Sequence, residues 1–181
     1  MSGNTKHKGE TMRAEYTEDY NGHTISIYHD DEYTVDLNDD SVFLVACHNQ
    51  FTVKYKDFTD KDIIELFLNP THDEYYLFPL RAYIHSGVSL SLSKTEYPFN
   101  DRFDSAWVGM VFIDKNEVNN SEDRAKEIAE GLIQTYNHVL SGEVYGYVIS
   151  KGGEKVESCW GFIGDYENCL NEAKDVVNNY K

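Results

Sequence analysis

Histidines with carboxylates beside them are the residues of this sequence that could hold a metal ion. Two of the seven histidines precede acidic pairs, in His29-Asp30-Asp31 and in His72-Asp73-Glu74. Neighbouring residues of a strand point to opposite faces, and no two histidines stand four positions apart as they do on a metal-binding helix. The acidic run 36–40 has no glycine at the position that a calcium loop requires. We therefore expect no metal site and no cofactor.

The candidate nucleophiles are the three cysteines, Cys47, Cys159 and Cys169. Cys159 could work as a thiol with His85 or His138 as its base, but its position in the middle of a strand, before Trp160, favours a packed core thiol. An odd number of cysteines without a C-x-x-C pair predicts reduced, mostly buried thiols and a cytosolic protein. The chain also has no phosphate-binding glycine loop and no nucleophile elbow. We expect that it is not an enzyme, with a metal-dependent hydrolase as a weaker alternative.

Net charge is the strongest signal in the sequence. The 181 residues carry 32 acidic and 16 basic side chains, a formal charge of −16. Direct binding to nucleic acid is disfavoured, because phosphate contacts need positive charge. The excess serves solubility, or it lets the protein compete for a basic groove that normally holds nucleic acid. For the second interpretation, the expected partner contacts are exposed turn carboxylates: Asp30, Asp31, Glu32, Asp39 and Asp40.

Alternating apolar residues predict strands over the first third of the chain. The runs 23–28 and 33–37 form a predicted hairpin about the acidic turn 30–32, and the runs 42–46 and 51–55 extend it to a four-stranded meander. A helix is predicted next, with Thr59 as its N-cap and the Asn69-Pro70 pair as its end.

The remaining two thirds predict five more strands and two helices. Gly109, Gly146 and Gly161 fall inside these strands, which predicts bulges or the close approach of another part of the chain. Ser121 and Asp165 are expected to cap the two helices. The predicted elements are strands at 75–84, 88–92, 107–113, 144–150 and 155–162, and helices at 121–141 and 165–180.

These elements predict an α+β fold in a single domain over residues 14–181. The expected architecture is one largely antiparallel sheet of about eight to nine strands, with three helices packed on it. Residues 1–13 are polar and are expected to form a disordered arm. No apolar run is long enough to span a membrane, and the N-terminus has no signal-peptide pattern, which predicts a cytoplasmic protein.

Slightly over half of the chain resembles a family of proteins from phages and other mobile elements. The similarity runs from about His85 to the C-terminus. It is carried by H-S-G-V-S-L-S at 85–91, Y-P-F at 97–99, D-S-A-W-V-G at 104–109, L-S-G-E-V-Y-G-Y at 140–147 and S-C-W-G-F-I-G-D at 158–165. These motifs are determinants of a fold and name no reaction.

The resemblance implies a role against host defence. Some proteins of this size and origin are anti-CRISPR proteins, which block type II Cas effector nucleases, and the chain is similar to such an inhibitor. The implied partner is a Cas effector, with or without its guide RNA, in the cytoplasm of the host bacterium; the oligomeric state stays open. The alternatives are an antirestriction-type DNA mimic and a phage interaction or structural module without an inhibitory role.

Overall fold

The computed structural model describes residues 13–34, 37–49, 51–55, 57–69, 71–92 and 105–180. These residues form nine strands and three helices, which confirms the predicted α+β class. The chain divides into two compact units, one made of residues 1–33 and 142–181 and the other of residues 34–141. The predicted arm lies outside the described residues except for Arg13, and the predicted single domain stays a prediction.

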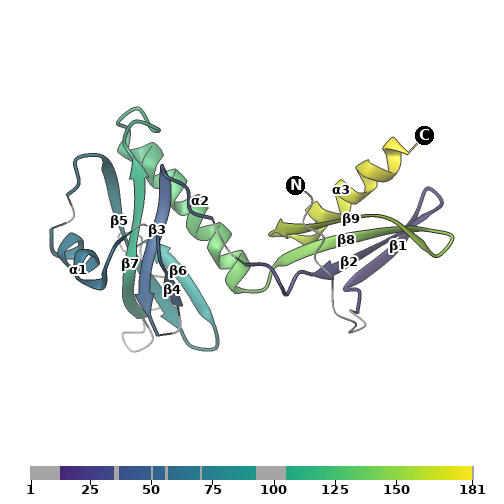
Figure 1. Cartoon of the computed structure of the whole chain (residues 1–181), viewed down its shortest axis with the longest axis horizontal. Helices are drawn as coiled ribbons and strands as arrows, with labels where there is room; N and C mark the ends of the chain where they lie inside the picture. The colour runs from purple at the N-terminus through teal and green to yellow at the C-terminus, as the bar shows by residue number, and fades with distance from the viewer. Residues whose placement is uncertain are drawn as a thin grey trace. The chain divides into compact units, whose positions relative to one another are not determined.

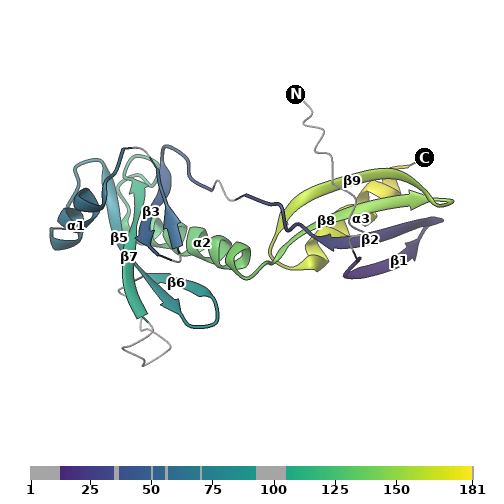
Figure 2. The ribbon, with the colours of Figure 1, turned by 60° about the horizontal axis from the view of Figure 1, so that its bottom comes forward.

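The first unit is a four-stranded antiparallel sheet with one helix against it. The strands lie in the order β1-β2-β8-β9, and helix α3 covers one face (Figure 2). The bounds are β1 Tyr16–Tyr20, β2 His23–His29, β8 Val144–Lys151, β9 Glu154–Ile163 and α3 Tyr166–Asn179.

The core of this unit follows from period-2 strands and a period-3.6 helix. Ile25 and Ile27 are fully buried on one face of β2, while the alternate residues Thr24 and Ser26 stay partly exposed. From α3, buried side chains at helical spacing meet them: Cys169, Leu170, Ala173 and Val177. Asp165 caps α3 as predicted, since its Oδ1 accepts a 2.9 Å hydrogen bond from the Glu167 N–H.

The N-terminal hairpin differs from the predicted one. β2 pairs with β1 on one side and with β8 on the other, and the two-residue turn between β1 and β2 is Asn21-Gly22. Both turn residues have positive φ, 47° and 75°, which is the conformation that Asn-Gly supplies in two-residue hairpins. Of the predicted strand, residues 33, 34 and 37 lie outside any strand, and residues 35–36 lie outside the described part of the chain.

The second unit is a five-stranded antiparallel sheet with a helix on each face. The strands lie in the order β4-β3-β7-β5-β6, and Figure 1 shows α1 and α2 on opposite sides of this sheet. The bounds are β3 Val42–His48, β4 Phe51–Val53, α1 Asp60–Leu68, β5 Tyr75–Ile84, β6 Val88–Leu92, β7 Ser105–Asp114 and α2 Glu122–Leu140.

Each face of this sheet has its own core. The core under α2 is mainly aliphatic and includes Leu44 and Val111 of the sheet and Ala129 of the helix. The face under α1 is aromatic, with Phe43 and Phe112 stacked at 4.5 Å between ring centroids. The apolar run of β3 fits this arrangement, because a strand between two other strands and buried on both faces needs no polar alternation.

The prediction of one sheet is wrong in its count: the nine strands form two sheets. Residues 34–141 lie in the sequence between β2 and β8, which pair directly with each other. The predicted meander is therefore divided, with β2 in one sheet and β3 and β4 in the other. Among the described residues, no helix is both long and apolar enough to cross a membrane.

The three strand glycines lie where the predicted bulges and close approaches occur. A Cβ on Gly109 would lie 2.0 Å from the Val45 carbonyl oxygen, and one on Gly146 would lie 2.2 Å from the Trp160 ring. Gly161, at φ 85°, is the extra residue where the pairing of β8 with β9 shifts register.

Candidate protein-binding surfaces

The first predicted contact group, Asp30-Asp31-Glu32, lies in the turn that follows β2 in the first unit. The backbone is fixed at Asp30, whose N–H donates to the Val144 carbonyl at 2.8 Å and whose carbonyl accepts from Tyr33 at 3.2 Å. Asp31 and Glu32 are exposed and Asp30 is half-buried. This turn therefore presents at least two carboxylates to solvent on a backbone held by hydrogen bonds.

The second group, Asp39-Asp40, lies near the start of the second unit, and both side chains form hydrogen bonds within the fold. Asp39 Oδ1 accepts hydrogen bonds from the N–H groups of Ser41 and Val42, both at 2.7 Å. Asp40 Oδ1 accepts from the Tyr55 hydroxyl at 3.1 Å. Both side chains are exposed, but they also order the entry into β3, because each provides an acceptor for neighbouring donors.

The five predicted residues thus belong to two units and not to one site within either. Asp31 and Glu32 are both exposed, whereas replacing Asp39 or Asp40 removes the hydrogen bonds described above. The role of all five in binding stays a prediction.

The acidic excess is divided evenly between the units. Residues 1–33 and 142–181 carry 14 acidic and 7 basic side chains, and residues 34–141 carry 18 and 9. Each unit therefore has two carboxylates for every basic side chain. Even if every lysine and arginine paired with one carboxylate, half of the carboxylates would have no basic partner of their own.

One ion pair fixes the edge strand β1 to α3. Lys174 Nζ lies 2.9 Å from Glu18 Oε1, and the Tyr16 hydroxyl donates to Glu18 Oε2 at 2.9 Å. The bond from Lys174, followed by that from Tyr16, lowers the pKa of Glu18, while the same contact raises the pKa of Lys174. This carboxylate is already engaged within the unit and is a poor candidate for binding a partner.

The cysteines correct the prediction of mostly buried thiols. Cys47 and Cys159 are exposed, and Cys169 is buried. Cys159 lies in the edge strand β9, where a side chain on the helix-covered face can still reach solvent at the margin of the sheet. Burial raises the pKa of the Cys169 thiol to about 12, so this thiol is unreactive in the folded protein. In the part of the chain that the structure describes, no three His, Cys, Asp or Glu side chains gather as metal ligands would.

A groove beside α1 is a surface that the sequence did not predict. It has a volume of about 530 Å³ and is lined by three apolar side chains, Phe58, Leu66 and Leu68, and by the polar residues Asp62, Glu65, Asn69, Thr71 and His72. Ile64 and Leu68, four residues apart on this helix, are both exposed. The available signal was the excess of apolar residues, since a nine-residue helix with one buried stripe does not need the apolar set 63, 64, 66, 67 and 68.

Comparison with protein-family models, with curated proteins and with solved structures found no match to this chain. The structure defines the class as an α+β fold of two antiparallel sheets.

Proposed function

We propose that this chain is a non-catalytic inhibitor of a nucleic-acid-dependent host defence enzyme, most simply a type II Cas effector nuclease. It would bind the effector protein and occupy a basic channel that otherwise holds nucleic acid. The observation that carries the proposal is the twofold excess of carboxylates in each of the two units.

The excess supports competition for a basic channel on physical grounds. Effectors of this type hold the guide–target duplex in a positively charged channel and contact it largely through its backbone. An acidic protein is attracted to the same surface, and its association is accelerated by long-range charge. Repulsion among the carboxylates at a net charge of −16 opposes folding. A positively charged partner would relieve this repulsion on binding, which gives the charge a function beyond solubility.

The first experiment is recovery of partners from a lysate of a CRISPR-bearing host on the immobilised chain. Capture is performed at low salt and at about 0.5 M salt, where exposed charge contacts are strongly screened. The proposal predicts a Cas effector at low salt and its depletion at high salt. Recovery of a restriction enzyme in its place would favour the antirestriction alternative, and recovery of no nucleic-acid enzyme would refute the proposal.

A purified effector then tests the step and the surface. The wild-type chain should block target DNA binding or cleavage by the guide-loaded effector. The double variant Asp31→Asn, Glu32→Gln should inhibit several-fold more weakly, because it removes exposed charge from the turn after β2. A matched control, Glu127→Gln with Glu130→Gln, removes the same charge from the exposed side of α2. Equal weakening by both variants would show that total charge, and not this turn, directs binding.

A further inference from the structure

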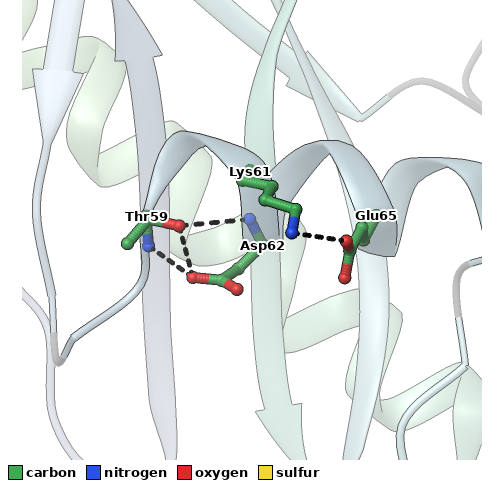
Figure 3. Close-up of polar contacts among 4 residues, drawn as sticks. All are labelled: Thr59, Lys61, Asp62 and Glu65. Atoms are coloured by element: carbon green, nitrogen blue, oxygen red, sulfur yellow. Dashed lines mark hydrogen bonds and ion pairs between the residues drawn. The ribbon is translucent and has the colours of Figure 1, made fainter.

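Helix α1 is short, but its start is firmly fixed. Thr59 is the N-cap in a capping box: the Asp62 N–H donates to Thr59 Oγ1 at 3.4 Å, and the Thr59 N–H donates to Asp62 Oδ2 at 2.8 Å (Figure 3). The Thr59 hydroxyl also donates to Oδ2, at 2.6 Å. The two bonds that Thr59 donates to the carboxylate lower the pKa of Asp62, the hydroxyl contributing most. Both end on Oδ2, so the cap leaves Oδ1 of an ionised carboxylate for other donors.

The same helix exposes apolar side chains beside this carboxylate. Ile63 is only 2% exposed and packs into the aromatic core, yet Ile64 is 52% exposed and Leu68 is 77% exposed. Leu68 has the largest exposed fraction among the large apolar side chains of the described residues. Of these exposed side chains, Leu68 lines the groove beside α1, together with Phe58 and Leu66. Apolar side chains at a groove, with polar residues around them, are typical of a surface that binds a partner.

Charge around the groove limits what that partner can be. From Asp57 to Glu74, which precedes β5, the chain carries six acidic side chains and one lysine, Lys61. Lys61 lies 3.6 Å from Glu65, but both side chains are largely exposed, so water competes with this pair (Figure 3). An acidic or neutral apolar segment would bring no compensating charge, whereas lysines and arginines would.

We propose that the groove beside α1 binds a basic amphipathic segment of a partner protein. An apolar side chain of that segment packs between Phe58, Leu66 and Leu68, and its flanking lysines or arginines lie against Asp62 and Glu65. The volume of about 530 Å³ accommodates one large side chain with its neighbours. The inference rests on the proposed function only for the identity of the partner, an enzyme with basic surfaces; the groove itself is argued from its lining.

The test uses a fluorescent peptide of lysines and leucines, with the leucines at helical spacing. Titration with the full chain should show saturable binding, and a peptide of the same pattern with glutamates in place of lysines should not bind. Leu68→Ser should weaken binding by at least about tenfold, the loss expected for one buried leucine. Its control is Val156→Ser, which removes another exposed aliphatic side chain, 44% exposed in β9 of the other unit, and should leave binding unchanged.

The contribution of the Glu65 carboxylate to peptide binding can also be tested against a matched control. Glu65→Gln should weaken peptide binding about threefold, the scale of a single exposed charge contact. Glu130→Gln removes the same kind of carboxylate, also 3.6 Å from a lysine four residues earlier, from α2, and should have no effect. Absence of wild-type binding, or equal losses in a variant and its control, would overturn the groove inference.

Inhibition assays separate this inference from the proposed function. If Leu68→Ser still inhibits the effector as well as wild type does, the groove is not the contact and only the inference fails. If the wild-type chain binds the peptide through the groove but inhibits no nucleic-acid enzyme, the proposed function fails and the groove remains a binding site.

Discussion

The same glycine-to-alanine change should have opposite effects at different positions. At Gly109 in β7, the new Cβ would lie 2.0 Å from the Val45 carbonyl oxygen of β3. At Gly131 in the exposed middle of α2, it would meet nothing within 4 Å. Gly146 lies between these cases, because the nearest obstacle to its Cβ is a side chain, the Trp160 ring, with the Cys159 carbonyl oxygen at 2.9 Å.

The change in unfolding free energy of each variant depends on which atoms the new Cβ must displace. A carbon approaches a carbonyl oxygen to about 3.3 Å, so Gly109→Ala requires more than an ångström of separation between two paired strands. Overpacking costs about 1–3 kcal/mol, and a backbone obstacle places this variant at about 3 kcal/mol. Gly146→Ala should cost about 1–2 kcal/mol. Gly131→Ala should stabilise by about 1 kcal/mol, the difference in helix propensity between the two residues.

Thermal and urea unfolding would measure these changes. In a chain of this size, 1 kcal/mol shifts Tm by about 2–4 °C. We therefore expect Gly109→Ala to lower Tm by about 6–12 °C and Gly131→Ala to raise it by about 2–4 °C. The two tryptophans report on the units separately, since Trp107 lies in one and Trp160 in the other. A Gly109→Ala protein with wild-type Tm would refute the β3–β7 pairing on which the estimate depends.

Three further predictions follow from single contacts. Maleimide should modify Cys47 and Cys159 in the folded protein and Cys169 only after unfolding, as mass spectrometry would show; rapid native labelling of all three would contradict the burial of Cys169. Because the pKa of Glu18 is lowered in the fold, its stabilising effect should be full above the unfolded carboxyl value of about 4.3 and decline as pH falls through the lower folded value. Urea unfolding of wild type and Glu18→Gln should therefore converge in acid, and a constant difference would refute this. Asp39→Ala should cost about 1–2 kcal/mol in urea unfolding, because two N–H groups lose their acceptor, and a neutral result would show that water replaces it.

Local signals in the sequence predicted most of the elements. The predicted N-caps Thr59, Ser121 and Asp165 are confirmed. A short polar side chain just before an apolar helical run can accept a hydrogen bond from an N–H group of the first turn, and this signal is local. The strand glycines were also informative, since a missing side chain marks positions where another part of the chain comes close. These features depend on a few neighbouring residues, which is why the sequence alone reveals them.

These local signals did not predict which strands pair with each other. The alternation of 23–28 correctly predicted a strand, but the predicted hairpin partner was the following run, 33–37. In the structure, the Asn21-Gly22 turn pairs this strand with the preceding one, β1. Its other neighbour, β8, begins at residue 144, and no local pattern identifies a partner that far away. Division of the strands into two sheets is a consequence of these pairings, so it was missed as well.

The candidate surfaces were predictable to the same limited degree. Carboxylates in turns are expected to be exposed, and Asp31 and Glu32 are. Periodicity does not reveal which side of a short apolar helix lacks a covering element, and on α1 Ile64 and Leu68 are exposed while Ile63 is buried. A helix has buried and open sides only in relation to the sheet beneath it, which is a property of the tertiary fold.

Charge and groove would contribute to different stages of one binding reaction. Dispersed carboxylates act at long range, so they would accelerate encounter with a basic partner and lose this effect in salt. An apolar side chain such as Leu68 acts only in contact, so it would govern how long the complex persists. If both proposals hold, neutralising Asp31 and Glu32 should mainly lower kon, and Leu68→Ser should mainly raise koff with little change in salt dependence. A surface that used charge alone would show both effects in kon, and the groove would then have no part in inhibition.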